Sequence, residues 1–288
     1  MKNNNFLARP GKNIRLADFD PAYTAKFHSR EEATAKLEKD IFRLAKYQDT
    51  LYAQNTQALL VIFQAMDAAG KDGTIKHVMS GVNPQGTQVF SFKAPSAEEL
   101  DHDYLWRCYK ALPERGRIGI FNRSYYEEVL VVRVHPEILK SSQLPKESFK
   151  NIWKNRFEQI NHFERYLVQN GIHIVKFYLN VSKEEQKRRF LARIERPEKN
   201  WKFSLNDAKE RGHWDDYMKA YEDVFKHTST KWAPWHIIPA DNKWFTRMTV
   251  ADLIVTKLKS MNLRYPTVSE QHLQELLKAK EALENEPR

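Results

Sequence analysis

The chain is short of cysteine and of long apolar runs. Cys108 is the one cysteine among 288 residues, so an intramolecular disulfide is excluded, and its apolar neighbours in YLWRCYKAL predict a buried, inert thiol. The longest uncharged apolar segment, residues 58–66, falls well below the ~18 residues that a membrane-spanning helix needs. The N-terminal stretch MKNNNFLARPGKNIRLADFD lacks the apolar core of a secretory signal. The sequence therefore predicts a cytoplasmic protein that does not enter a membrane.

Several signatures of particular chemistries are also missing. The ten histidines show neither H-E-x-x-H nor another paired-ligand spacing, so zinc is unsupported, and no G-x-S-x-G elbow suggests acyl transfer. The formal charge is +10 and the isoelectric point is near 9.4, yet no basic zipper or aromatic RNA-binding motif accompanies that charge. Nucleic acid is therefore not expected as a partner. The charge fits either another polyanion or a mildly basic protein that binds no polymer.

Short apolar runs alternate with amphipathic segments along the chain. Because parallel neighbouring strands need crossover connections, this alternation predicts an α/β fold with a doubly wound, parallel, five-stranded sheet. Ligands of such sheets bind beyond the carboxyl ends of the strands. The expected strands are ALLVIF, TQVFSF, RIGIFN, HIVKFYLNV and WHIIPAD, and the expected helices span residues 30–55, 73–82, 96–112, 148–169, 182–195, 215–228 and 244–261.

The segment QAMDAAGKDGTIK follows the first apolar strand and resembles an incomplete phosphate loop. The usual pattern is G-x-x-x-x-G-K followed by Ser or Thr, but Ala65 replaces the first glycine and Asp72 replaces the hydroxyl residue. Lys71 keeps a glycine just before it and another two residues later, and a helix is expected to begin there, which favours anion binding. Asp67 offers a hard oxygen suited to Mg²⁺. The alternative is an ordinary glycine turn with a solvated lysine.

Two further segments carry charge that suits a phosphate. In GIFNRSYYEEVL, Asn122 occupies the strand end where phosphate-loop enzymes usually keep a metal-positioning Asp, and Arg123 supplies a guanidinium fork matched to phosphate oxygens. A simple turn is the alternative. In SKEEQKRRFLARIERPEKNWK, Arg189 and Arg193 lie four residues apart on one predicted helix face and could form an anion clamp on a mobile lid. The alternative there is a solvated charged helix.

Taken together, these motifs resemble the polyphosphate kinase 2 family from about residue 18 to residue 262. The family's loop D-A-A-G-K-x-G-T-I is present at residues 67–75, and its N-P-x-G turn at residues 83–86. Its D-R-S-x-Y motif appears at residues 122–126, its lid pattern E-Q-x-x-R-F-x-x-R at residues 185–193 and W-K-x-S at residues 201–204. A late A-P-W lies at residues 233–235 and D-x-K at residues 241–243.

The resemblance implies a phosphate-loop kinase, related in fold to thymidylate kinase and carrying a helical lid. It implies Mg²⁺-dependent phosphoryl transfer, with Mn²⁺ as a second candidate ion, between inorganic polyphosphate and nucleotides, turning AMP or ADP into ADP or ATP reversibly. Asn122 departs from the commoner Asp, and Glu127 with Glu128 replaces the more usual Asn-Arg. This form resembles the subgroup that phosphorylates nucleoside monophosphates as well as diphosphates.

The expected site residues fall into three groups. Asp67 and Asn122 are expected to hold the metal. The catalytic set is Asp67, Lys71, Asn122, Arg123, Arg189 and Arg193. The phosphate- and nucleotide-binding set is Ala68, Ala69, Gly70, Asp72, Gly73, Thr74, Lys93, Tyr126, Glu127 and Glu128.

We expect an N-terminal segment and amphipathic helix at residues 1–55, a phosphate-loop kinase core at 56–262 with its lid at about 182–212, and a C-terminal helix or tail at 263–288. The tail is either a solvated extension or an oligomer contact, and a homodimer or homotetramer is expected. Two other functions stay open: an ATP-dependent kinase of a small substrate such as a nucleoside monophosphate, and a polyanion binder without catalytic activity.

Overall fold

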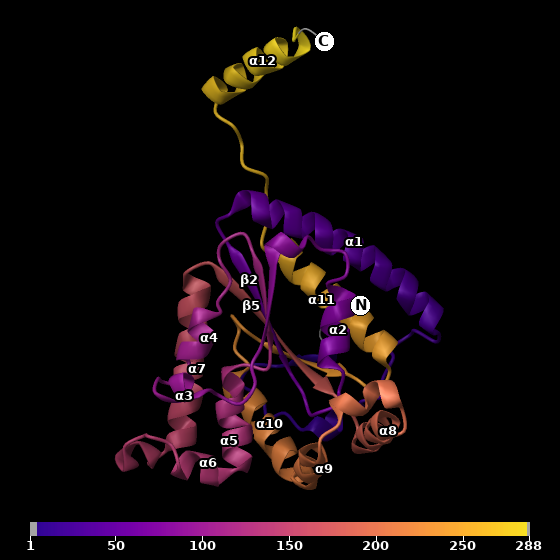
Figure 1. Ribbon diagram of the computed structural model, residues 1–288, viewed down its shortest axis with the longest axis vertical. Coiled ribbons are helices and arrows are strands. Elements are labelled where there is room, and N and C mark those ends of the chain that lie inside the picture. Colours follow the sequence, from indigo (N-terminus) through magenta and orange to yellow (C-terminus); the bar gives the residue numbers. More distant parts are fainter. Residues whose placement is uncertain (1–4, 287–288) are drawn as a thin grey trace.

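A computed structural model describes residues 5–286 and shows a six-stranded sheet between two layers of helices (Figure 1). Five parallel strands follow the expected runs: β2 (Ala58–Gln64), β3 (Thr87–Ser91), β4 (Ile118–Asn122), β5 (Ile172–Asn180) and β6 (Trp235–Pro239). The expectation of five strands misses β1 (Leu7–Ala8), which pairs antiparallel with β6. The strand order is β1-β6-β5-β2-β4-β3, so β2 lies near the centre of the sheet.

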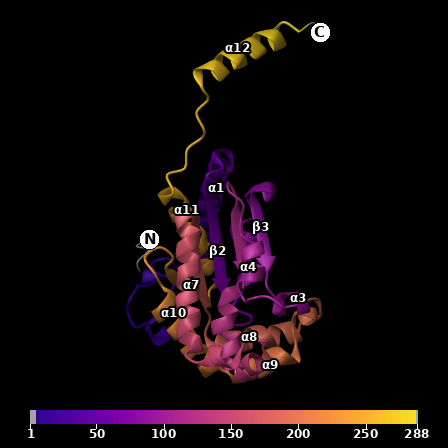
Figure 2. The ribbon, with the colours of Figure 1, turned by 90° about the vertical axis from the view of Figure 1, so that its left-hand side faces the viewer.

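Helices cover both faces of the sheet, which explains the continuous apolar character of β2, whose seven residues are all buried. One layer contains α1 (Arg30–Gln54), α2 (Lys71–Val78) and α11 (Lys243–Ser260) (Figure 1). The other contains α4 (Trp106–Lys110), α5 (Val131–Val134), α7 (Ile152–Gln169) and α10 (Trp214–Thr228) (Figures 1 and 2). The doubly wound α/β prediction is therefore confirmed.

The remaining elements are short or lie outside these layers. The α-helices among them are α3 (Ala97–Leu100), α6 (Pro136–Lys140), α8 (Lys183–Ile194), α9 (Leu205–Gly212) and α12 (Glu270–Glu284). The 3-10 turns are η2 (Leu16–Asp18), η3 (Pro84–Gly86), η4 (Tyr125–Val129), η5 (Lys146–Phe149) and η6 (Pro197–Lys202). None of the helices between residues 5 and 286 is long and apolar enough to cross a bilayer.

One long helix expected at residues 96–112 is two short ones. Ser96 caps α3 with the reciprocal capping box that its spacing with Glu99 predicts. The Asp103 carboxylate then accepts a hydrogen bond from the Leu105 amide (2.9 Å) in a turn that starts α4. Cys108 on α4 is buried as predicted, and burial raises the pKa of its thiol to about 12.

The C-terminal helix α12 stands away from the body of the molecule on an extended linker (Figures 1 and 2). Ser269 caps it by accepting a hydrogen bond from the His272 amide (3.2 Å). Its leucines remain exposed, at 47% for Leu273 and 70% for Leu283. The predicted polar C-terminal helix is thus present, and it leaves an apolar stripe uncovered.

Candidate functional site

The phosphate loop connects β2 to α2 through two residues with left-handed backbone. Ala68 has φ 61° and Gly70 has φ 105°, and the Gly70 carbonyl accepts the first helical hydrogen bond of α2 from the Thr74 amide (2.9 Å). A left-handed alanine costs on the order of 1 kcal/mol, so the surrounding structure must hold it there. The N-terminus of α2 begins directly after the loop, and helix N-termini favour anions.

Lys71 is buried at the start of α2. Its ammonium donates a hydrogen bond to the Ala65 carbonyl (3.0 Å), which places it on the inner side of the loop. Burial lowers the pKa of Lys71, and the nearby Asp67 carboxylate opposes that shift. The solvated lysine of the ordinary-turn alternative is therefore not what the structure shows.

The strand ends of β2 and β4 bring Arg123 to the loop. The Arg123 amide donates to the Phe63 carbonyl on β2 (3.0 Å), and its guanidinium donates to the Asp67 carboxylate (3.0 Å). Arg123 also has left-handed backbone, with φ 65°. Burial opposes its charge, but the Glu127 and Asp67 carboxylates raise the pKa of Arg123 overall. A lysine, an arginine and an aspartate thus gather at one sheet edge, as the motif positions predict.

Two buried amide oxygens face this edge without a hydrogen-bond partner in the described chain. Asn122 donates through Nδ2 to the Asp72 carboxylate (2.7 Å), which leaves its Oδ1 unpaired. Gln64 donates through Nε2 to the Glu127 carboxylate (3.0 Å), which leaves its Oε1 unpaired. Unpaired buried carbonyl oxygens are costly unless a ligand or ion satisfies them.

The oxygen atoms at this edge fit Mg²⁺, an ion that proteins often bind together with the phosphates of a substrate, better than an ion bound by protein side chains alone. Residues 5–286 contain no group of three or more His, Cys, Asp or Glu side chains arranged to hold a metal. Mg²⁺ commonly binds through one or two carboxylates and the phosphates of its substrate. The Asp67 carboxylate and the unpaired Asn122 Oδ1 fit that pattern, because they would supply part of a coordination shell and leave the rest to phosphate oxygens.

The residues that follow Arg123 point in different directions. Glu127 faces the loop through its bond with Gln64. Glu128 instead forms an ion pair with Arg156 on α7 (3.0 Å), and burial raises the pKa of Glu128 while Arg156 opposes that shift. Tyr126 has no exposed surface, and its hydroxyl donates to the Glu164 carboxylate on α7 (2.8 Å). The 3-10 turn η4 rotates that ring into the core.

The segment predicted to be a lid contains α8, η6 and α9, and it lies beyond the carboxyl ends of the strands. Arg193 Nη1 approaches the Asp207 carboxylate on α9 (3.5 Å) and the Lys202 carbonyl (3.4 Å). Burial and then the charge of Asp67 raise the pKa of Asp207, so α9 lies within electrostatic reach of the loop. Trp201 in η6 is 77% exposed, so this turn is largely accessible to solvent.

Arg189 is not half of an open anion clamp with Arg193. Its five N–H groups are all engaged by protein acceptors, and its side chain is buried. The two arginines therefore contact different partners, and an open anion clamp of the kind that their spacing suggests is not what the structure shows. A spacing of four residues gives a shared face but does not say what lies opposite each side chain.

Lys93 and a group of cations on α11 extend the positive charge around the loop. Lys93 is exposed just after β3, at the same sheet edge. Arg247 Nη2 lies 3.8 Å from where a Cβ on Gly73 would stand. Burial lowers the pKa of Lys243, and the charges of Arg189, Lys199 and Arg247 lower it further. Arg247 therefore lies close to the first turn of α2, and Lys243 lies within electrostatic reach of Arg247 and Arg189.

Sequence reasoning missed four residues that the structure places at or near this edge. Gln64 could have been found as the polar residue that closes an apolar strand, and Lys243 as the end of the D-x-K motif. Gln186 and Asp207 lie in charged segments where no local pattern distinguishes them from neighbours.

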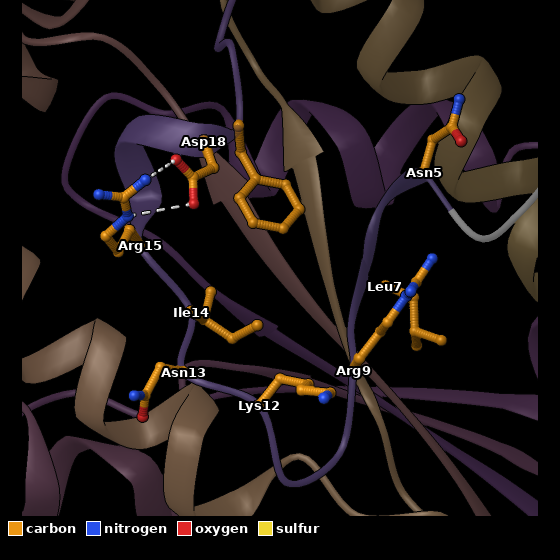
Figure 3. Close-up of a pocket in the computed structure, with 9 residues that line it drawn as sticks. Asn5, Leu7, Arg9, Lys12, Asn13, Ile14, Arg15 and Asp18 are labelled. Atoms are coloured by element: carbon orange, nitrogen blue, oxygen red, sulfur yellow. Dashed lines mark hydrogen bonds and ion pairs between the residues drawn. The ribbon is translucent and has the colours of Figure 1, made fainter.

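A shallow pocket of about 320 Å³ lies elsewhere, along the N-terminal segment (Figure 3). The Arg15 guanidinium there is paired with Asp18 (2.8 Å), as the dashed lines in Figure 3 show. None of the motif residues lines this pocket, so it is separate from the candidate site.

Comparisons with known proteins agree with this geometry. The family described as Polyphosphate kinase 2 (PPK2) matches residues 27–266. An ADP-polyphosphate phosphotransferase from Rhodopseudomonas palustris is 50% identical over 98% of this chain and 99% of its own. An AMP/ADP-polyphosphate phosphotransferase from Meiothermus ruber is 42% identical over 91% of this chain and 94% of its own.

A crystal structure of polyphosphate kinase 2 from Arthrobacter aurescens superposes with a TM-score of 0.84 at 39% identity, covering 95% of this chain and 98% of that one. The phosphate loop and its arginine therefore stand in a fold that a solved relative shares almost throughout, and the chain belongs to the polyphosphate kinase 2 family.

Proposed function

We propose that this protein transfers phosphoryl groups reversibly between inorganic polyphosphate and nucleotides, converting AMP or ADP into ADP or ATP. The observation that carries the proposal is the convergence of Lys71, Arg123 and Asp67 at the phosphate loop, in a chain whose relatives bear polyphosphate phosphotransferase names. The relatives differ in whether AMP appears in the name. Use of AMP as well as ADP is therefore the finer part of the proposal, and Glu127 beside Gln64 is the acidic group placed to influence it.

The chain's residues would act mainly by positioning and charge neutralisation. Loop amides and the N-terminus of α2 hold the phosphates of the donor, while Lys71 and Arg123 neutralise oxygens around the migrating group. A terminal phosphate oxygen of the nucleotide forms the new P–O bond as the P–O bond to the shortened polymer breaks. That oxygen is already anionic, so no general base is required.

Asp67 and Asn122 would hold Mg²⁺, with Mn²⁺ as the second candidate. When bound, the ion would neutralise phosphate charge and orient the chain of phosphates. Lys243, Arg247 and Lys199 would line the path of more distant phosphates, because an unbranched polyanion longer than a nucleotide needs cations beyond the loop. This accounts for the net charge of +10 without nucleic acid as a partner.

The direct test is an endpoint assay of AMP, ADP, GMP and GDP with polyphosphate, with and without Mg²⁺. We expect ADP from AMP and ATP from ADP, with no product when Mg²⁺ is chelated or polyphosphate is omitted. A product that forms only when ATP replaces polyphosphate would identify an ATP-dependent kinase instead. Binding of polyphosphate without turnover of any nucleotide would favour the remaining alternative, a polyanion binder without catalytic activity.

The proposal also includes a cytoplasmic homo-oligomer, a dimer or a tetramer. The exposed leucines of α12, Leu273, Leu276, Leu277 and Leu283, offer a contact that the body of the same chain does not cover in Figures 1 and 2. We expect light scattering to give a multiple of 34.1 kDa for the full chain and a smaller assembly for a chain ending at residue 266. The same number of subunits in both assemblies would exclude α12 from the contact.

A further inference from the structure

Helix α8 holds three consecutive carbonyl groups of the phosphate loop. Gln186 Nε2 donates to the Asp67 carbonyl (3.0 Å). Arg189 Nη1 donates to the Ala68 carbonyl (2.9 Å) and to the Ala69 carbonyl (2.8 Å). The three carbonyls directly before Gly70 are thus bound from the α8 side, whereas the Ala65 carbonyl accepts from Lys71 and the Met66 carbonyl from the Ala69 amide. The contact joins residues about 120 positions apart in the chain.

The same arginine ties this loop to the one that follows β6. Arg189 Nη2 donates to the Ala240 carbonyl (2.6 Å) and to the Asp241 carbonyl (3.0 Å). Its Nε donates to the Glu185 carboxylate one turn earlier (2.7 Å). Burial lowers the pKa of Arg189, and Glu185 opposes that shift. Two loops and one helix therefore meet on a single buried guanidinium.

These bonds fix the direction of the loop amides. A trans peptide is planar, so the N–H that follows each carbonyl points the opposite way. Since the Asp67 and Ala69 carbonyls point toward α8, the N–H groups of Ala68 and Gly70 point away from it, into the concave side of the loop. The left-handed backbone of Ala68 is the strained conformation that this arrangement requires.

We propose that Arg189 and Gln186 are positioning residues that hold the phosphate loop in its anion-binding conformation from behind, without contacting the transferred phosphate. The proposal rests on the proposed function only in naming polyphosphate as the anion. Arg193, one turn further along α8, contacts the Lys202 carbonyl and the Asp207 carboxylate and not the loop. Ser182 is held beside the same two loops, because its amide donates to the Asp241 carboxylate (2.8 Å).

Lysine cannot replace Arg189 in this role. A guanidinium presents five donors in a planar fork, whereas an ammonium presents three from one atom and reaches one cluster of acceptors. Arg189→Lys keeps the positive charge and loses the bridge between two loops. Gln186→Leu carries no charge change at all, and it removes the donor to the Asp67 carbonyl. Both variants should therefore loosen the same loop.

The test compares Arg189→Lys and Gln186→Leu with Lys187→Ala, an exposed cation on the same helix, and with Arg193→Ala. Hydrogen exchange of the free protein is read for residues 66–72. We expect exchange there to rise at least about tenfold in the first two variants, with the sheet unchanged, and to stay at the wild-type rate in Lys187→Ala. This readout does not depend on polyphosphate being the substrate.

Kinetics supply the second readout. In Arg189→Lys and Gln186→Leu we expect the KM for polyphosphate to rise about tenfold or more, the KM for the nucleotide to stay within about twofold, and the salt dependence of polyphosphate binding to be unchanged. Arg193→Ala removes a cation that bonds no loop carbonyl and that we expect to bind phosphate, so it should reduce that salt dependence. Lys187→Ala should match the wild type.

Two results would overturn the proposal. One is unchanged loop exchange with a reduced salt dependence in Arg189→Lys, which would place the guanidinium on the phosphate itself. The other is a loss of kcat in step with thermal stability and with both KM values unchanged, which would leave only a structural role. Should Arg189→Lys fail to fold, Gln186→Leu decides the question. A failure of the proposed function shows instead as wild-type protein inactive on polyphosphate.

Discussion

Lys71→Ala is expected to lower kcat/KM for polyphosphate by at least about 10³-fold. The Lys71 ammonium is buried on the inner side of the loop, where a charge directed at phosphate oxygens is worth far more than in water. No described neighbour on α2 can substitute, because Asp72 is acidic and Lys76 is exposed. The measurement is initial-rate production of ATP from ADP and polyphosphate, with Lys76→Ala as the matched control that should retain wild-type rates.

The same residue should shape the alkaline side of the pH profile. Burial lowers the pKa of Lys71, so its cation is lost at a lower pH than that of an ordinary lysine, near 10.4. The profile of kcat/KM reports groups of the free enzyme and should therefore decline at high pH before an exposed lysine would titrate. More than a tenth of wild-type activity in Lys71→Ala would contradict the assigned role.

Local sequence pattern determined most of the fold. Four parallel strands are apolar runs, β3 alternates apolar and polar residues, and each long helix keeps one apolar face, so these elements could be predicted directly. The edge strand β1 could not, because Leu7 and Ala8 form it only by pairing with β6, more than 200 residues away. The break between α3 and α4 depends on the Asp103 side chain competing for a backbone amide.

Some residues of the candidate site could likewise be predicted from the sequence, and others could not. Asp67, Lys71 and Arg123 could be placed together because parallel strands end at one edge, and the structure brings all three there. Arg189 and Tyr126 could not be placed, since each lies within a motif but turns toward a partner far along the chain. Motif membership predicts proximity to the site, whereas side-chain direction depends on the tertiary contacts of the element that carries it.

A buried ion pair supports the segment that carries Arg123. The Lys176 ammonium on β5 donates to the Glu164 carboxylate on α7 (2.6 Å), to the Tyr126 hydroxyl (2.8 Å) and to the Thr228 carbonyl (2.9 Å). The Tyr126 hydroxyl donates in turn to Glu164 (2.8 Å). Both charged side chains have no exposed surface. The network therefore anchors Tyr126 of η4, three residues after Arg123, to the sheet and to α7.

Lys176→Met is accordingly expected to destabilise the protein by about 3–5 kcal/mol, because it leaves the Glu164 carboxylate buried and uncompensated. That loss corresponds to a fall of roughly 10 °C in Tm, measured by calorimetry. Lys154→Met on α7, which breaks an exposed pair with Glu158, should change stability by less than about 1 kcal/mol.

The double variant Lys176→Met with Glu164→Gln separates lost charge compensation from lost packing. Glutamine keeps an oxygen that can accept from the Tyr126 hydroxyl and removes the buried negative charge, so most of the lost stability should return. A double variant no more stable than Lys176→Met would show that the lysine acts through packing instead. Where stability returns, η4 keeps its anchor to α7, so activity should recover together with Tm.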